Sequence, residues 1–233
     1  NKDLTIKSLD SGKHVFCEKP PCFTADEMKL IIDAETKSGK KLMYGFNHRY
    51  HGSIKKTKEI IDSKQFGDII NLRGVYGKSS IVPFTNQWRS MKIFSGGGIL
   101  LDQGIHMLDM FRYFCGDFEE VKSFVSNNYW GHDVEDNAYA IMRDKQGRVA
   151  LIHSSATQWQ HSFRLEITFK GTKTRLTGLS CFDFLTATQG LLQIIEAEIK
   201  SNLTEYEGSD YINKYVHEVF KDKEIKVYKD SER

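Results

Sequence analysis

The chain has 233 residues, of which 39% are hydrophobic, 27% charged and 12% aromatic. This composition is typical of a folded globular protein and excludes a disordered or collagen-like chain. Lysine plus arginine number 33 and aspartate plus glutamate 31, so the formal net charge of +2 does not favour nucleic acid as a partner. No apolar run approaches the ~20 residues that span a membrane, and the first residues show no signal-peptide pattern.

The four cysteines, Cys17, Cys22, Cys115 and Cys181, are widely scattered. Neither a C-x-x-C pair nor the spacing of a zinc site occurs, so no metal is expected. A chain of this length builds its own core without disulfide bonds. We therefore expect free thiols and a cytoplasmic location.

The first 45 residues predict a strand–helix–strand unit that follows an initial helix over residues 4–11. The expected strands are 14–17 and 41–45, and the helix between them runs from 24 to 39. This order and length are typical of one right-handed βαβ unit in a parallel sheet.

The central helix of this unit has a clear start and stop. Thr24 and Glu27 form a capping box, and Gly39 supplies the terminating residue. Its apolar side is predicted to consist of Met28, Ile31, Ile32 and Ala34.

Two loops follow the carboxyl ends of these strands, where parallel sheets bind ligands. Glu18-Lys19-Pro20 follows the first strand, and Asn47-His48-Arg49-Tyr50 follows the second. Position makes both loops candidate sites, although Glu18 and Lys19 could equally be solvated loop charges.

The middle of the chain predicts a helix over 53–63, a strand over 68–76, a loop with Trp88-Arg89, and a long helix over 99–114. On a helical wheel, Asp102, His106, Asp109 and Tyr113 form one narrow polar stripe. The opposite, core-facing side consists of Leu100, Met107, Phe111 and Phe114.

Three glycines, Gly96–Gly98, precede this long helix. They allow a ligand to approach the backbone, and we expect free N–H groups at the positive end of the helix dipole. An Asp/His pair one turn apart, here Asp102 and His106, is more often a solvated helix edge than a catalytic site. Neither G-x-G-x-x-G nor a Walker A motif occurs in the 233 residues.

The remainder predicts an antiparallel sheet whose inner face is covered by helices 53–63 and 99–114. The expected strands are 120–130, 137–143, 148–157 and 163–170. Beyond residue 171 an amphipathic helix is expected over 210–221, and an edge strand or tail over 224–233.

Some of these strands carry apolar side chains on both faces, which predicts a homo-oligomer contact on the outer face of the sheet. The two sets are Val149, Leu151 and Trp159 on one side, and Ala150, Ile152 and Ala156 on the other.

In order and spacing, Glu18-Lys19-Pro20, the Gly45–Tyr50 segment and Gly96-Gly97-Gly98…Asp102-x-x-x-His106 resemble the glucose–fructose oxidoreductase / inositol dehydrogenase (Gfo/Idh/MocA) family. The resemblance covers about residues 1–180. It implies a mixed α/β fold: a Rossmann domain followed by an open, mostly antiparallel sheet domain with helices on one face. It also implies an NAD- or NADP-dependent oxidoreductase acting on a hydroxyl of a sugar, sugar derivative or cyclitol.

The resemblance also implies roles for individual residues. Lys19, Asp102 and His106 match the catalytic positions, and Asp102 would also orient the substrate or tune His106. Glu18, Pro20 and Arg49 match cofactor-binding positions, and Trp88 and Arg89 match substrate-binding ones. The ordinary pKa of histidine suits His106 to be the base that deprotonates the hydroxyl, while Lys19 would stabilise the developing alkoxide.

The Gly-rich half of a Rossmann domain is absent, so we divide the chain into a Rossmann remnant (1–46) and a substrate and oligomerisation domain (47–233). We expect the chain to be a fragment of a longer protein and, by itself, almost inactive. The alternative is a non-catalytic sugar-binding or regulatory relative that has lost the cofactor-binding half. Redox-neutral chemistry with tightly held NAD, such as elimination, also remains open.

Overall fold

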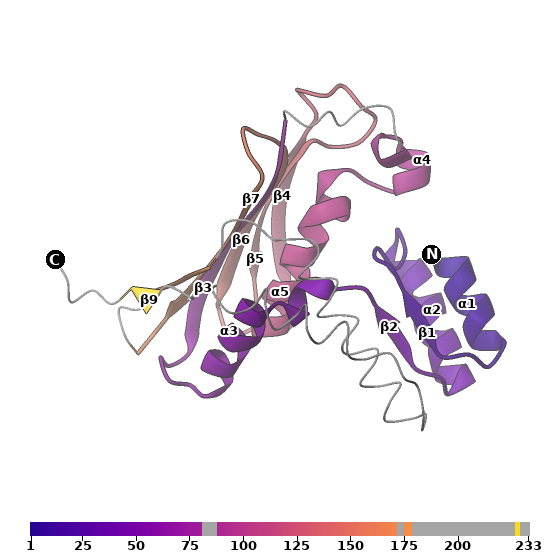
Figure 1. Ribbon diagram of the computed structural model, residues 1–233, viewed down its shortest axis with the longest axis horizontal. Helices are drawn as coiled ribbons and strands as arrows, with labels where there is room; N and C mark the ends of the chain where they lie inside the picture. Colours follow the sequence, from indigo (N-terminus) through magenta and orange to yellow (C-terminus); the bar gives the residue numbers. More distant parts are fainter. Residues whose placement is uncertain (81–87, 172–174, 179–226, 229–233) are drawn as a thin grey trace, which may run out of the picture.

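The computed structural model describes residues 1–80, 88–171, 175–178 and 227–228. A small α/β unit at the N-terminus lies beside a large sheet whose inner face carries helices (Figure 1). The helices are α1 (Lys2–Asp10), α2 (Ala25–Ser38), α3 (Gly52–Asp62), α4 (Lys92–Ser95) and α5 (Ile105–Cys115). Short turns of other helix types are η1 (Asn47–Tyr50), η2 (Trp88–Ser90) and the π-helical η3 (Leu100–Gly104). The strands are β1 (Val15–Cys17), β2 (Leu42–Tyr44), β3 (Ile69–Ser79), β4 (Glu120–Ser126), β5 (Asn137–Arg143), β6 (Val149–Gln158), β7 (Ser162–Phe169), β8 (Arg175–Gly178) and β9 (Val227–Tyr228).

The N-terminal unit is the predicted βαβ arrangement. Strands β1 and β2 pair in parallel, and α2 connects them. Thr24 Oγ1 accepts the Glu27 N–H at 3.2 Å, as a capping box requires. The Glu27 carboxylate accepts the N–H of Phe23 at 2.9 Å, so it reaches back one residue beyond the cap. Gly39, with φ of +63°, ends the helix as expected.

The predicted apolar side of α2 is only partly correct. Ile31 and Ala34 are buried, whereas the Ile32 residue is 51% exposed. Within the described ranges, α1 packs against α2, and Ile31 and Ala34 are the residues of α2 that are buried.

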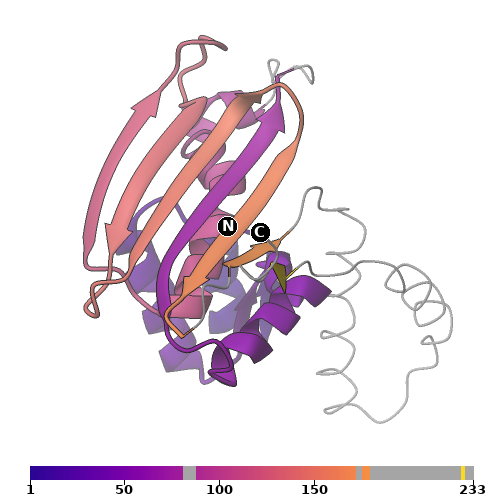
Figure 2. The ribbon, with the colours of Figure 1, turned by 90° about the vertical axis from the view of Figure 1, so that its left-hand side faces the viewer.

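The large sheet has the order β4-β5-β6-β3-β7-β8-β9 and is antiparallel at every pairing except one. That exception is β3 beside β6, which run parallel with Asn71 opposite Val149. Figure 2 shows the outer face of the sheet open toward the viewer, with the helices behind it. The prediction of an open, mostly antiparallel sheet is therefore confirmed.

Helices α3 and α5 build the core against the inner face of the sheet, as predicted. Met107 and Phe111 of α5 are fully buried, and Ile54 of α3 joins the same cluster with Leu165 of β7. Gly74 of β3 makes room for α5, because a Cβ there would lie 2.6 Å from Met107 and 2.8 Å from Phe111.

The polar stripe of the long helix is not a solvated edge. His106 is 5% exposed, and the side chains of Asp102 and Asp109 are 15% and 9% exposed. The Asp102 carboxylate lies 3.4 Å from Lys19 of the N-terminal unit and the His106 ring stacks on His48, so protein rather than water covers this pair. The helix begins with the π-helical turn η3, a form that often marks functional sites.

The expected free N–H groups at the start of this helix are occupied. The Glu135 carboxylate accepts the N–H of Gly98 at 2.8 Å and that of Leu100 at 3.1 Å, and its carbonyl accepts the N–H of Ile99. The carboxylate also complements the helix dipole. The expectation of free N–H groups at this helix start is therefore wrong for Gly98 and Leu100, because a side chain 37 residues downstream of Gly98 binds both.

Some sequence-based expectations fall outside the described residues. These are the helix over 210–221, Cys181, and all of the 224–233 segment except Val227–Tyr228, which forms the edge strand β9. No helix in the ranges that the structure describes is long and apolar enough to cross a bilayer.

Candidate active site

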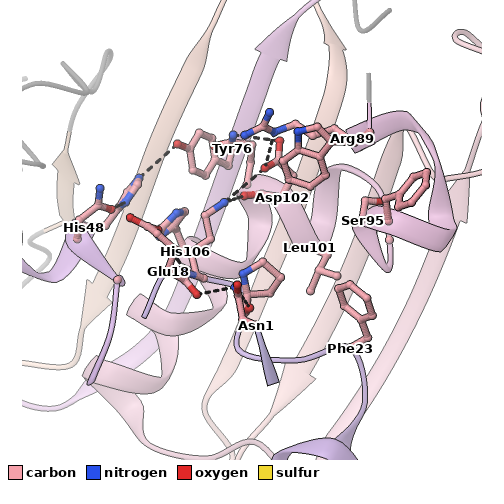
Figure 3. A pocket seen from close by; sticks show the side chains of 18 residues that line it. Asn1, Glu18, Phe23, His48, Tyr76, Arg89, Ser95, Leu101, Asp102 and His106 are labelled. Atoms are coloured by element: carbon pink, nitrogen blue, oxygen red, sulfur yellow. Dashed lines mark hydrogen bonds and ion pairs between the residues drawn. The ribbon is translucent and has the colours of Figure 1, made fainter. Parts of the chain in front are cut away.

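A pocket of about 600 Å³ lies between the N-terminal unit and the start of the long helix. Its lining comes from the loops after β1 and β2, from β3, and from the segment that runs from η2 into α5 (Figure 3). This volume is ordinary for a small-molecule site. Its position at the carboxyl ends of β1 and β2 agrees with the rule for parallel sheets.

Lys19 reaches from the loop after β1 to the η3 turn. Its Nζ donates to the backbone carbonyl of Asp102 and lies 3.4 Å from the Asp102 carboxylate. Both side chains are largely buried, with 16% and 15% exposure. An enclosed ion pair of this kind keeps a cation at a fixed place on the pocket floor.

A second cation faces the same carboxylate. Arg89 Nε lies 3.6 Å from Asp102 Oδ1, and the Arg89 guanidinium stacks over the Trp88 ring at 4.4 Å. Trp88 and Arg89 both line the pocket. The structure therefore brings these two predicted substrate-binding residues to the predicted catalytic group.

His106 lines the same pocket from the first turn of α5. Its Nδ1 is buried and lacks a hydrogen-bond partner among the described residues. Burial first, then the neighbouring His48 and Lys19, lower the pKa of His106 to about 2. The ring is thus neutral at physiological pH, but the expectation of an ordinary histidine pKa is wrong because the sequence does not reveal the burial.

The loop after β1 is held in place from two sides. Asn1 Nδ2 donates to the carbonyls of Glu18 and Pro20 at 2.9 and 2.8 Å. The Glu18 carboxylate packs on Gly45, where a Cβ would lie 3.0 Å from Oε2. Glu18 and Pro20 both line the pocket, and the Lys19–Pro20 peptide is cis.

Arg49 is the one predicted site residue that the structure places elsewhere. Its guanidinium binds Asp109 through two hydrogen bonds of 2.7 and 2.6 Å and lies 4.9 Å from the centre of the Tyr113 ring. It is not among the residues that line the pocket. The hydrogen bonds that Arg49 donates to Asp109 raise the pKa of Arg49, as expected of a structural ion pair.

Several residues of the pocket received no individual role from the sequence, and His48 and Tyr76 are two of them. His48 lies in the Asn47–Tyr50 loop, which was a candidate site because it follows a strand. The sequence thus indicated the loop, but it did not indicate which side chain of the loop lines the pocket. Tyr76 lies on the inner face of β3, because every second residue of a strand faces the same side and Leu72 and Gly74 face inward. This alternation predicts that Tyr76 is buried, but not that it belongs to a site.

A nicotinamide cofactor fits part of this pocket. Polar groups gather on its floor, and the unpartnered Nδ1 of His106 leaves Nε2 as the ring nitrogen available to a ligand. Glu18, Lys19 and Pro20 would hold the nicotinamide end. The N–H groups of Gly98 and Leu100 offer no cradle for the pyrophosphate, because Glu135 binds both.

Comparison with known proteins agrees with this geometry. The profile of the GFO/IDH/MocA C-terminal domain matches residues 54–177, and that of an oxidoreductase family with an NAD-binding Rossmann fold matches residues 1–46. The chain therefore belongs to the GFO/IDH/MocA family of oxidoreductases.

Curated relatives include a D-glucoside 3-dehydrogenase of Escherichia coli strain K12, 28% identical over 84% of this chain and 60% of the relative. A myo-inositol 2-dehydrogenase of Thermotoga maritima is 30% identical over 66% of this chain and 46% of the relative. A solved levoglucosan dehydrogenase in complex with NADH superposes with a TM-score of 0.69, at 28% identity, over 76% of this chain and 50% of that one. The chain thus spans about half the length of the relatives it matches.

Proposed function

We propose that the protein is an NAD- or NADP-dependent oxidoreductase that acts on a hydroxyl of a sugar, sugar derivative or cyclitol. The observation that carries this proposal is the meeting of Lys19, from the loop after β1, with Asp102 and His106, from the start of the long helix, at one pocket. The named activities of the relatives, a glucoside, an inositol and a levoglucosan dehydrogenase, support the substrate class.

When bound, the oxidised nicotinamide would accept a hydride from the carbinol carbon of the substrate. His106 Nε2 accepts the hydroxyl proton. A base of low pKa suffices here, since the hydroxyl becomes strongly acidic as its carbon loses the hydride. Lys19 stabilises the negative charge that develops on the oxygen. This electrostatic stabilisation is stronger in an enclosed site of low dielectric than in water.

The remaining site residues bind and orient. Asp102, fixed between Lys19 and Arg89, accepts hydrogen bonds from neighbouring hydroxyls of the substrate. Trp88 offers an aromatic face beside the sugar. Glu18 and Pro20 shape the nicotinamide end, and Arg49 acts on this end only indirectly, through the loop it anchors to Asp109.

The test is the rate of nicotinamide reduction by the full-length protein with glucosides, inositols and anhydrosugars. His106→Ala should lower kcat by ~10²–10⁴-fold with little change in cofactor affinity, as expected for a lost general base. Lys19→Ala should lower both kcat and the affinity for the cofactor. The matched controls are Lys29→Ala on the exposed side of α2 and His14→Ala at the surface before β1.

Sugar binding by calorimetry without turnover, in a protein whose His106→Ala variant binds equally well, would instead favour the non-catalytic alternative. Product with no net nicotinamide reduction would favour redox-neutral chemistry.

We further propose that residues 1–46 belong to the nucleotide-binding domain and 47–233 to a substrate and oligomerisation domain. Residues 1–233 alone should bind the dinucleotide weakly and turn over little, since they lack a G-x-G-x-x-G loop. The outer face of the sheet is the proposed homo-oligomer contact. A cytoplasmic location is proposed because Cys17, Cys22 and Cys115 are free thiols.

A further inference from the structure

A second buried histidine stacks face to face on the proposed base. The ring centres of His48 and His106 are 4.0 Å apart and their planes differ by 22°. His48 is 6% exposed and belongs to η1, 58 residues before its partner in the chain. Figure 3 shows His48, His106 and Tyr76 gathered at the same end of the pocket.

The ring of His48 is itself held by two hydrogen bonds. Its Nδ1 lies 2.8 Å from Asn47 Oδ1, an acceptor, so Nδ1 carries the hydrogen. The lone pair on Nε2 then accepts the Tyr76 hydroxyl at 3.3 Å. Burial, and after it the charges of His51 and Lys19, lower the pKa of His48 to about 3. His48 is thus a neutral ring in a fixed orientation.

His106 has no comparable support of its own. A catalytic histidine is normally oriented by a third group that binds its second nitrogen. In the described part of the chain, Nδ1 of His106 finds no such group. What fixes its ring is the stack on His48 together with an edge contact with Phe46, at 6.0 Å and 81°.

We propose that His48 is a positioning residue for proton transfer at His106, acting through the ring stack in place of the missing hydrogen-bond partner. The inference rests on the proposed function. In the step itself the substrate O–H bond breaks and an N–H bond forms at His106 Nε2. A bound oxidised nicotinamide would take the hydride from the carbinol carbon with both bonding electrons, which would leave the substrate as a carbonyl compound.

The stack also determines what the new imidazolium faces. The charged and titratable groups around His106 are Lys19 from the loop after β1, Asp102 from its own helix, Tyr76 from β3 and His48 from η1. Burial, and after it His48 and Lys19, disfavour this cation, so the stack orients the ring of His106 and does not stabilise its charge.

The experiment compares His48→Ala, His48→Phe and His48→Gln in the full-length protein. Phe keeps a ring that can stack, whereas Gln keeps a partner for the Tyr76 hydroxyl but has no ring. His48→Ala should lower kcat by ~10²-fold, the order expected when a reacting group is misplaced by about 1 Å, with KM nearly unchanged. His48→Phe should recover most of this loss and His48→Gln little. The control is His153→Phe, because His153 stacks on Tyr139 at 4.2 Å and 15° away from the pocket.

A second measurement needs no cofactor. The ring protons of His106, assigned by their loss in His106→Gln, should show an upfield NMR shift from the stacked ring of His48. This shift should persist in His48→Phe and disappear in His48→Ala. Unfolding midpoints of all variants separate lost activity from lost folding.

Wild-type kcat in His48→Ala, or recovery by Gln and not by Phe, would overturn the positioning role. If His106→Ala and Lys19→Ala also retain full turnover, the proposed function itself fails. If those two variants lose turnover and His48→Ala does not, only the present inference fails.

Discussion

Arg49 and Asp109 form a two-point ion pair that fastens the loop after β2 to the middle of α5. The Asp109 side chain is 9% exposed and the Arg49 side chain 38%. The guanidinium also lies over the Tyr113 ring, and lysine could not reproduce its two-point contact with the carboxylate. The pair holds η1, and with it His48, against the helix that carries His106.

Arg49→Ala should therefore destabilise the protein by about 1–2 kcal/mol, since it leaves a buried carboxylate unpaired while the exposed arginine is partly screened by solvent. Chemical unfolding measures this difference. Arg112→Ala removes a surface pair with Asp117 and should cost less than about 1 kcal/mol. Unchanged stability together with a large loss of cofactor affinity would mean that Arg49 binds the cofactor directly.

The two stacked histidines predict a stability that falls with acid. Burial lowers the pKa of both from 6.5, to about 3 for His48 and about 2 for His106, so the unfolded chain binds more protons below pH 6.5. The contribution of the two rings to the free energy of unfolding is fully present above pH 6.5. It is lost as the pH falls, by up to about 1.4 kcal/mol per pH unit for each ring.

Urea midpoints between pH 7 and 4.5 measure this slope, which His106→Phe should reduce and His14→Phe should not. The pKa of Asp144 is also lowered, through its contacts with Arg148, but that carboxylate loses its contribution only below pH 3.8. An unchanged slope in His106→Phe would show that the ring is not buried in its neutral form.

Glu135 should stabilise the start of the long helix, whose N–H groups at Gly98 and Leu100 it binds. Glu135→Ala frees the N–H groups of Gly98 and Leu100 and removes a negative charge from a helix start, which should cost about 1–2 kcal/mol. Glu119→Ala, on an exposed carboxylate, is the control. The affinity of the Glu135→Ala variant for pyrophosphate tests whether the vacated N–H groups can then hold an anion.

The outer face of the sheet predicts self-association. Phe124 of β4 is 80% exposed, and Ile141 of β5 and Trp159 beyond β6 are 51% and 74% exposed. Apolar exposure of this extent on a sheet face is typical of a contact surface. Phe124→Glu with Ile141→Glu should lower the mass in solution by light scattering. Ile93→Glu, at a residue of similar exposure on α4, should not; a wild-type monomer at micromolar concentration would contradict the prediction.

Local chemistry allowed much of the secondary structure to be predicted. The capping box at Thr24, the glycine at Gly39 and the alternation of Phe163, Leu165 and Ile167 each act within a few residues. The family was predicted from a resemblance of longer motifs, Glu18-Lys19-Pro20, the Gly45–Tyr50 segment and Gly96-Gly97-Gly98…Asp102-x-x-x-His106, and the comparisons confirmed it.

Tertiary structure alone decided the features that involve distant partners. Three such contacts join residues that are far apart in the sequence. His48 stacks on His106, 58 positions away, and Arg49 pairs with Asp109, 60 positions away. Glu135 accepts the N–H of Gly98, 37 positions before it. A helical wheel shows that His106 shares a face with Asp102, but not whether water or protein covers that face. Since burial determines the protonation of His106, its pKa could be obtained only from the packed structure.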